Sequence, residues 1–195
     1  MSGRPPTVTL FCGASKAVDP AYFRVAEAAG RFLGQRGIGV VYGGGTVGLM
    51  GAAADAALKA GAPVTGVIPA FLVEREGMML EGAELEVVGS MMERKHRMAQ
   101  LADAFVVLPG GLGTLDEVFE ILTWTQLGLL RDKPLGFLNP LGFFDRLFGF
   151  LRELGEKNFI PAASAPDWFA APTMERLWTG LVARWPAAPG STAPD

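Results

Sequence analysis

The sequence predicts an α/β fold in which an open parallel sheet carries helices on both faces. Short apolar runs alternate with segments of helical spacing along the 195 residues. Most of these runs are continuously apolar, which is typical of strands buried on both faces. Glycine is abundant at 26 residues, and eight of them lie in two stretches, 43–51 and 110–113, that each follow an apolar run. These glycines indicate junctions at which the backbone must approach another group closely.

Six strands are expected, at Thr7–Phe11, Ile38–Tyr42, Val64–Ile68, Leu85–Val88, Phe105–Leu108 and Leu135–Leu138. Six helices are expected between and after them, at Ala21–Arg36, Gly48–Ala60, Met91–Ala102, Thr114–Leu129, Phe143–Glu156 and Thr173–Trp185. The first helix has its apolar residues on one face, and the second is rich in alanine and suited to close packing on a sheet. The alternation predicts a single domain at residues 1–185 with right-handed connections, followed by a frayed tail at residues 186–195.

The composition excludes several classes of protein. Cys12 and His96 are the single cysteine and histidine, so one chain cannot hold a disulfide or a zinc site built from several such ligands. A Ser-His-Asp or Cys-His mechanism would depend on His96 alone. The net charge is −3, with acidic and basic residues interspersed, unlike a nucleic-acid surface. No secretory signal or membrane-length apolar run is visible, so we expect a cytoplasmic protein without nucleic-acid or membrane partners.

The first glycine stretch follows the second expected strand and opens the alanine-rich helix. Gly43, Gly45 and Gly48 satisfy the spacing G-x-G-x-x-G. A dinucleotide fold would place this pattern after the first strand, with an acidic residue at the tip of the next strand. Here the next strand ends in 67–69, Val-Ile-Pro, which disfavours NAD. Gly44 and Gly45 are expected to support a ligand-binding loop, and the alternative is that the glycines only permit close packing.

The second glycine stretch follows the expected strand Phe105–Leu108 and leads into a helix. Glycines at a helix N-terminus allow bare N–H groups to converge on an anion, which the helix dipole also favours. Thr114 can add its hydroxyl, either as the N-cap or as a phosphate donor. No lysine follows the last glycine, so a nucleoside triphosphate P-loop is not indicated and a monophosphate fits better. Because both loops leave the carboxyl ends of parallel strands, they predict a site for a phosphate-bearing ligand.

Glu117 has two interpretations. It lies three residues after Thr114, which matches a capping box at a helix start. The functional alternative places its carboxylate beside a phosphate-linked sugar, where it would stabilise positive charge at C1 or orient a water molecule. Glu120 lies one turn further along the same face and could support either role.

The other concentration of charge is residues 93–97, Glu-Arg-Lys-His-Arg. For His96 and Arg97 a solvated helix face is the favoured interpretation, and His96 is disfavoured as a general base. Arg94 and Lys95 are expected near the carboxyl edge of the sheet, where they could contact a phosphate or a base. Arginine supplies a planar fork of donors for this purpose, and lysine supplies a point charge.

At these positions the sequence resembles the LONELY GUY (LOG) family of cytokinin riboside 5′-monophosphate phosphoribohydrolases, often labelled possible lysine decarboxylases. The family motif P-G-G-x-G-T-x-x-E stands at Pro109–Glu117 without a gap, and the family's R-K pair stands at Arg94-Lys95. Further stretches that look like the family are Phe11–Gly13, Tyr42–Gly45, Gly48–Gly51, Gly66–Pro69 and Thr123–Gly128. The resemblance spans residues 7 to 160.

The resemblance implies a Rossmann-like fold, a homodimer and no cofactor or metal. It implies hydrolysis of the N-glycosidic bond of an adenine-type nucleoside 5′-monophosphate, either AMP or N6-substituted AMP, to the free base and ribose 5-phosphate. Arg94 and Glu117 would be the catalytic pair. The substrate contacts would be Glu76, Lys95, Gly111, Leu112, Gly113, Thr114, Leu115, Asp116 and Thr123. The apolar residues 124–130 are consistent with a partner surface, and equally with packing beneath the C-terminal helix.

The sequence departs from the family pattern at two positions, and two alternative functions have to be considered. Ala14 and Met92 stand where the family commonly has serine and histidine, which leaves the preferred base open. The alternative function is a non-catalytic carrier or sensor of a nucleotide or phosphorylated cofactor, which would not need both Arg94 and Glu117. A pyridoxal-phosphate decarboxylase would need a Schiff-base lysine, and Lys95 is the only lysine near the predicted site.

Overall fold

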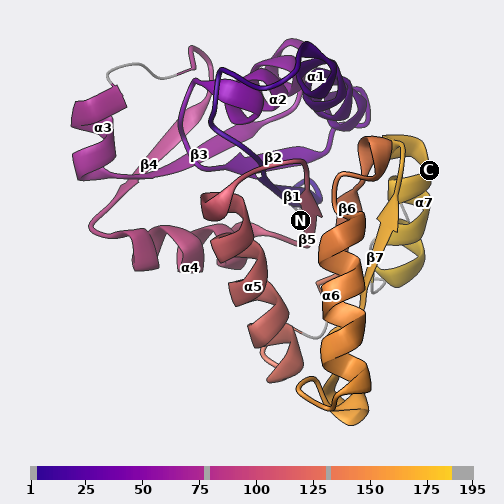
Figure 1. Ribbon diagram of the computed structural model, residues 1–195. Helices are drawn as coiled ribbons and strands as arrows, with labels where there is room; N and C mark the ends of the chain where they lie inside the picture. The colour runs from indigo at the N-terminus through magenta and orange to yellow at the C-terminus, as the bar shows by residue number, and fades with distance from the viewer. Residues whose placement is uncertain (1–3, 77–79, 131–132, 186–195) are drawn as a thin grey trace.

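Seven parallel strands form one sheet in the order β4-β3-β2-β1-β5-β6-β7 (Figure 1). The structure is a computed structural model that describes residues 4–76, 80–130 and 133–185, and the expected tail at 186–195 lies outside these residues. The strands are β1 (Thr7–Phe11), β2 (Gly39–Tyr42), β3 (Val64–Pro69), β4 (Glu84–Val88), β5 (Ala104–Val107), β6 (Leu135–Leu138) and β7 (Trp168–Ala171). The predicted open parallel sheet is confirmed.

Helices cover both faces of this sheet. They are α1 (Pro20–Gly34), α2 (Gly48–Lys59), α3 (Ala70–Glu76), α4 (Met91–Leu101), α5 (Leu112–Gln126), α6 (Asp145–Glu156) and α7 (Met174–Arg184). The helices α1, α2 and α7 pack on one face, and α4, α5 and α6 pack on the other. None of the helices in the described ranges is long and apolar enough to cross a bilayer.

The strand β5 shows why the apolar runs do not alternate. Ala104 and Val106 contribute to the core beneath α1, α2 and α7, whereas Phe105 and Val107 contribute to the core beneath α4, α5 and α6. Successive side chains of a strand point to opposite faces, and here both faces are covered. The run therefore has to be apolar at every position.

Four elements were not predicted: the strand β7, the helix α3 and the short 3-10 helices Pro140–Gly142 and Ala162–Ser164. The strand β7 is short, and it pairs with β6 from Leu135–Trp168 to Leu138–Ala171 at the edge of the sheet. The helix α3 follows β3 without an intervening loop. All six predicted strands and six predicted helices are present; two strands have the predicted bounds, and the ends of the other elements differ by at most three residues.

The helices α1 and α2 pack closely through two glycines. A Cβ on Gly30 would collide with the carbonyl of Ala53, and a Cβ on Gly34 would lie 2.6 Å from the carbonyl oxygen of Ala57. Because Gly30 and Gly34 have no side chains, α1 and α2 can lie this close together. Gly30 and Gly34 lie outside the two glycine-rich stretches at 43–51 and 110–113.

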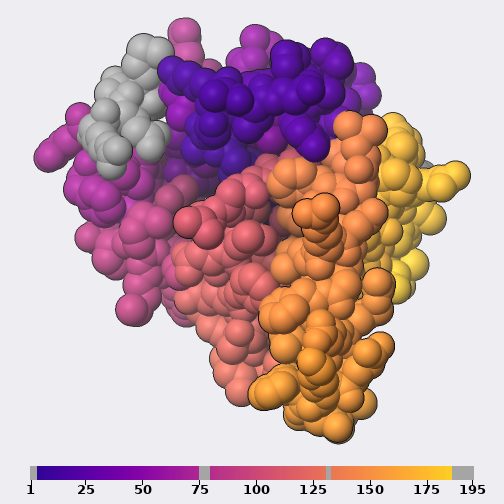
Figure 2. Space-filling model, viewed as in Figure 1, coloured from indigo at the N-terminus to yellow at the C-terminus, as the bar shows by residue number. Residues whose placement is uncertain are grey.

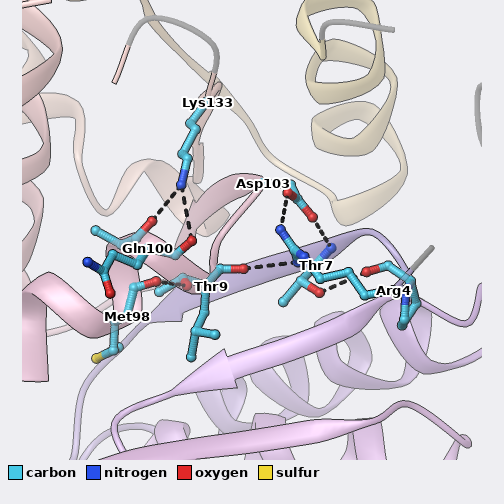
Figure 3. A network of polar contacts seen from close by, with 10 residues as sticks. Arg4, Thr7, Thr9, Met98, Gln100, Asp103 and Lys133 are labelled. Carbon is cyan, nitrogen blue, oxygen red and sulfur yellow. Dashed lines mark hydrogen bonds and ion pairs between the residues drawn. The ribbon is translucent and has the colours of Figure 1, made fainter. Parts of the chain in front are cut away.

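The C-terminal end of α4 is anchored to the rest of the protein (Figure 3). The buried hydroxyl of Thr9, in β1, donates to the carbonyl of Met98 at 2.9 Å. Lys133 Nζ donates to the last carbonyls of the helix, at 2.7 Å for Ala99 and 3.4 Å for Gln100. A cation at this end also complements the helix dipole. These contacts hold the helix whose opposite end carries Arg94.

Candidate active site

The strand order of the sheet reverses between β1 and β5. The chain proceeds from β1 through β2 and β3 to β4 on one side, and from β5 through β6 to β7 on the other. The loops that leave β1 and β5 therefore diverge, and such switch points are where open α/β sheets bind ligands. The two predicted glycine loops, after β2 and β5, flank this point.

A cavity of about 480 Å³ lies at this switch point. It is lined by the loops after β1, β2 and β5, by the first turns of α1, α2, α4 and α5, and by the loop before α6. Figure 2 shows the N-terminal segments in indigo, α5 in rose and the start of α6 in orange meeting on one face of the molecule. The lining includes Cys12, Gly43, Arg94, Gly111, Gly113, Thr114, Asp116 and Glu117.

Close backbone contact joins the loops after β1 and β5. The N–H of Gly13 donates to the carbonyl of Pro109 at 3.0 Å. A Cβ on Gly13 would lie 3.2 Å from the Cα of Gly110, and a Cβ on Gly110 would collide with the Thr114 side chain. Glycine at these positions allows the two loops to form one continuous wall of the cavity.

Arg94 enters the cavity from the first turns of α4. Ser90 caps this helix by accepting from the N–H of Glu93 at 3.1 Å, and the Glu93 carboxylate accepts from the N–H of Gly89 at 2.8 Å. The Arg94 side chain is only 8% exposed. Its Nη2 donates to the carbonyl of Gly43 at 3.0 Å, whereas its Nε finds no hydrogen-bond partner among the described residues. The guanidinium also lines the cavity, where it can meet a negatively charged or electron-rich ligand atom.

Gly43 makes room for this arginine. A Cβ at position 43 would collide with the Arg94 guanidinium and would lie 2.9 Å from the sulfur of Met50. Gly44 and Gly45 are the residues predicted from the sequence to support the loop. Neither lines the cavity; Gly44 instead has a φ of 78° and packs against the side chain of Ile68. The first glycine of the loop is therefore the one that shapes the cavity.

The helix α5 begins earlier than predicted. Its N-cap is Gly111, which provides no side-chain cap, and its first backbone bond within the turn is from the N–H of Leu115 to the carbonyl of Gly111 at 3.0 Å. The N–H groups of Leu112, Gly113 and Thr114 therefore have no carbonyl partner within the helix. Such a cluster of free donors at a helix N-terminus is suited to an anion. Of the two interpretations of Thr114, the N-cap is therefore wrong, and the phosphate donor stays a prediction.

The capping interpretation of Glu117 is also wrong, because this residue lies in the second turn of α5. Its side chain lines the cavity and is partly buried. Burial raises the pKa of Glu117 to about 7, and the negative charges of Asp116 and Glu120 act in the same direction. The positive charges of Arg94 and Lys95 partly oppose this rise. Near neutral pH the carboxyl group is therefore present in both protonation states.

The remaining walls are mainly apolar. Cys12 is a buried free cysteine at the end of β1, where burial and then the charge of Glu117 raise its pKa, so the thiol stays neutral. Tyr22 and Phe143 meet edge to face with their ring centroids 5.6 Å apart, and both line the cavity. The cavity thus combines charged groups with aromatic surface. Tyr22 and Phe143 come from separate elements, and no local sequence pattern indicates that they share a site.

Lys95 does not line the cavity. Its ammonium group lies 3.0 Å from Asp116 Oδ2 and 3.2 Å from Glu120 Oε2. Burial alone would lower the pKa of Lys95, but the hydrogen bonds and charges of the two carboxylates raise it above its usual value. The lysine therefore remains charged.

Several other predicted contacts lie outside the cavity. Leu112 is 87% exposed and offers only its backbone N–H, and Leu115 does not reach the lining. The Thr123 hydroxyl donates to the carbonyl of Phe119 at 2.7 Å, and both line a separate groove between α5 and α6. Glu76 is the last residue of α3, and its side chain lies outside the described part of the chain.

The two residues that were expected on a solvated face lie there. His96 is exposed, with Nε2 2.8 Å from Nε2 of Gln100. Arg97 pairs with the carboxylate of Glu86. Neither residue lines the cavity.

Solved structures of molybdenum cofactor carrier proteins share the fold. The molybdenum cofactor binding protein from the phototrophic bacterium Rippkaea orientalis matches with a TM-score of 0.67 and 22% identity, covering 93% of this chain and 98% of that chain. The carrier protein from Chlamydomonas reinhardtii matches with a TM-score of 0.67 and 20% identity, covering 92% and 99%. At these identities the likeness shows the fold alone.

Sequence relatives are more similar. The cytokinin riboside 5′-monophosphate phosphoribohydrolase LOG of Oryza sativa subsp. japonica is 41% identical over 170 residues, which cover 87% of this chain and 70% of the relative. The protein named LOG3 of Arabidopsis thaliana is 40% identical over 170 residues, covering 87% and 79%. A family profile described as "Possible lysine decarboxylase" matches residues 50–181. The chain therefore belongs to the LONELY GUY (LOG) family, to which the sequence analysis had likened it.

Proposed function

We propose that the protein hydrolyses the N-glycosidic bond of an adenine-type nucleoside 5′-monophosphate, AMP or N6-substituted AMP, to the free base and ribose 5-phosphate. One observation carries this proposal: Arg94 and Glu117, from different helices, line one cavity beside the free N–H groups that begin α5. The relatives reported above are named as phosphoribohydrolases, which supports the same reaction.

The N-terminus of α5 would bind the 5′-phosphate. The N–H groups of Leu112, Gly113 and Thr114 supply donors, and the helix dipole favours the negative charge. Glu117 lies one turn further along the same helix, so a phosphate bound at these donors brings the ribose towards its carboxylate. Tyr22 and Phe143 offer aromatic surface on which a purine could stack.

The reaction would proceed through a sugar with oxocarbenium character. As the bond between C1′ and the base nitrogen breaks, the Glu117 carboxylate stabilises the positive charge at C1′. A water molecule forms the new C1′–O bond and gives its proton to Glu117, whose pKa near 7 suits a general base at neutral pH. The base leaves with the electron pair, and Arg94 offsets the negative charge that develops on the base. The base then takes up a proton from solvent water, and Glu117 releases to solvent the proton that it accepted.

The contacts of Lys95 disfavour the decarboxylase interpretation. A Schiff base with pyridoxal phosphate requires a neutral amine, which burial away from anions would favour. Lys95 instead lies between two carboxylates that raise its pKa. Its environment therefore favours the charged form that cannot attack an aldehyde.

Base release tests the proposed reaction directly. We expect purified protein to release free base from AMP or from isopentenyladenosine monophosphate, measured by chromatography. The Glu117→Gln variant should bind nucleotide with a similar Kd and lose turnover by a factor of about 10²–10⁴, because the amide accepts no proton. Tight binding without release from either nucleotide would contradict the hydrolase and favour a carrier.

We also propose that the protein is a homodimer that associates through the exposed end of α5. Leu127 and Leu129 are 66% and 67% exposed, next to the groove that contains Phe119 and Thr123. Trp124 packs on the core instead, so only part of the apolar stretch is available to a partner.

A further inference from the structure

The loop that joins β6 to α6 carries an aromatic side chain into the cavity. It spans residues 139–145, and its Phe143 lines the cavity, where the ring meets Tyr22 edge to face. We propose that this loop is preformed to present Phe143 to the base of the nucleotide, and that Asn139 is the positioning residue that holds it in this shape. The inference rests on the proposed function for the identity of the ligand.

The backbone of this loop is strained in its middle. Leu141 has a φ of 56° and a ψ of 21°, in the left-handed region that leucine rarely adopts. Its side chain is 85% exposed, so packing of that side chain does not compensate the strain. Gly142 follows with a φ of 70°, and a Cβ there would collide with the carboxylate of Asp145. Such strain persists only where the surrounding contacts determine the conformation.

Asn139 provides contacts of this kind at the start of the loop. Its Oδ1 accepts from the N–H of Phe144 at 2.8 Å, and its Nδ2 donates to Oδ1 of Asp145 at 2.8 Å. Its own N–H donates to the carbonyl of Ala171, in β7, at 2.8 Å. The Asn139 side chain therefore ties the far end of the loop to a point that the sheet fixes.

Apolar packing fixes the residue next to Phe143. Phe144 is 2% exposed in the core beneath α4, α5 and α6, and its ring lies 5.3 Å from the ring of Phe137 between centroids. Phe143 is 41% exposed, and its ring stands nearly perpendicular to that of Phe144. The core thus holds the Phe144 side chain, and Asn139 holds its N–H. Together these contacts set the direction of the preceding side chain, towards the cavity.

The chemistry of Phe143 indicates which part of the nucleotide it meets. A phenyl ring has no hydrogen-bond donor for a phosphate, and it contacts planar bases through its face or edge. The donors for a phosphate lie instead at the start of α5. A loop that is ordered before the ligand arrives also loses less conformational entropy on binding. Asn139 should therefore increase the affinity for the base through Phe143.

Binding of AMP and of ribose 5-phosphate, which lacks the base, tests this assignment. Calorimetry in the Glu117→Gln background avoids cleavage of AMP. We expect Phe143→Ala to raise the Kd for AMP by about 5- to 20-fold, because stacking is lost, and to leave the Kd for ribose 5-phosphate within twofold. Asn139→Ala should raise the Kd for AMP by about 3- to 10-fold. Phe150→Ala, at a 54% exposed site on α6 outside the cavity lining, should change neither Kd.

A double-mutant cycle separates positioning from a merely structural role. When Phe143→Ala is already present, Asn139→Ala should change the Kd for AMP by less than about 1.5-fold, because the ring that it positions is gone. Asn139→Asp combined with Asp145→Asn exchanges the amide and the carboxylate while keeping both hydrogen bonds, and should restore the Kd of the background protein. Melting temperatures and circular dichroism check that each variant is folded.

Three results would overturn the inference. They are an unchanged Kd for AMP in Phe143→Ala, an equal rise in the Kd for ribose 5-phosphate, and the same effect of Asn139→Ala with and without Phe143. Failure of the proposed function is distinguishable, because it appears as absence of base release from the wild-type protein. The inference is decided by the Kd values alone.

Discussion

At the scale of single residues, Glu117 is the group whose ionisation should govern activity. If its carboxylate is the active form, kcat/KM should be constant above about pH 8 and fall below pH 7, approaching tenfold for each unit of pH. Initial rates of base release between pH 5 and pH 9 test this. A profile that stays flat to pH 5 would assign proton acceptance to another group.

The same pKa has a consequence for stability. Burial raises the pKa of Glu117 from 4.5 to about 7, so the folded protein retains a proton that the unfolded chain loses between these values. Stability therefore decreases as the pH rises through this window. Glu117→Gln removes the penalty and should gain about 2 kcal/mol more unfolding free energy at pH 8 than at pH 5, measured by urea denaturation. Glu27→Gln, at an exposed site on α1, is the matched control.

Gly43 should be intolerant of any side chain. Gly43→Ala places a Cβ against the Arg94 guanidinium, so Arg94 must leave the carbonyl that holds it. We expect turnover to fall by about 10²-fold with the fold retained, by circular dichroism. Gly155→Ala, where a Cβ meets no atom within 4 Å, should leave turnover unchanged. Normal turnover in Gly43→Ala would show that the Arg94–Gly43 contact is dispensable.

At the scale of elements, the buried strands were predictable because both faces of the sheet are covered, which leaves continuous apolar runs. The start of α5 was not, because Thr114 and Glu117 have the spacing of a capping box while the helix uses Gly111 as its N-cap. The short edge strand β7 follows a segment with Pro161 and Pro166, which obscures its pattern. A local pattern identifies an element well where packing is uniform, and less well at its ends.

The contact between α1 and α2 gives the prediction at this scale. Gly30→Ala places a Cβ against the carbonyl of Ala53, so the two helices must separate or shift. Overpacking of this kind should destabilise the protein by about 1–3 kcal/mol in urea denaturation. Gly149→Ala on α6 meets no atom within 4 Å and should instead be neutral or stabilising by up to about 1 kcal/mol. Equal stability of the two variants would remove the proposed role of Gly30.

At the scale of the whole molecule, the sequence predicted charged groups that line the cavity, but not the apolar walls around them. The residues of each motif are neighbours along the chain. This is why Arg94, Glu117 and the loop at 110–114 could be recognised from the sequence. Tyr22 and Phe143 meet only after α1 and the loop before α6 fold onto the same edge. No local sequence pattern indicates such a contact, so the apolar walls of the cavity could be identified only from the structure.

The proposed dimer is tested by changing the exposed end of α5. Replacing both Leu127 and Leu129 by glutamate places charge on the proposed partner surface, and we expect the mass by light scattering at micromolar concentration to fall from dimer to monomer. Phe71→Glu, at a 53% exposed site on α3, should leave the mass unchanged. In Figure 1, α3 lies at the upper left, apart from the lower end of α5. A wild-type monomer would reject the dimer itself.

The start of α5 has a consequence for how this fold can diversify. The free N–H groups and Glu117 lie within two turns of one helix, so their relation is set by helical geometry alone. Inserting one residue between Thr114 and Glu117 would rotate the anion donors and the carboxylate by about 100° relative to each other. Because Val118, Ile121 and Leu122 are packed in the core, the donors would be displaced and the carboxylate would stay. A chain that retains its ligand and loses hydrolysis would therefore arise by substitution of Glu117, and not by a change in the length of α5.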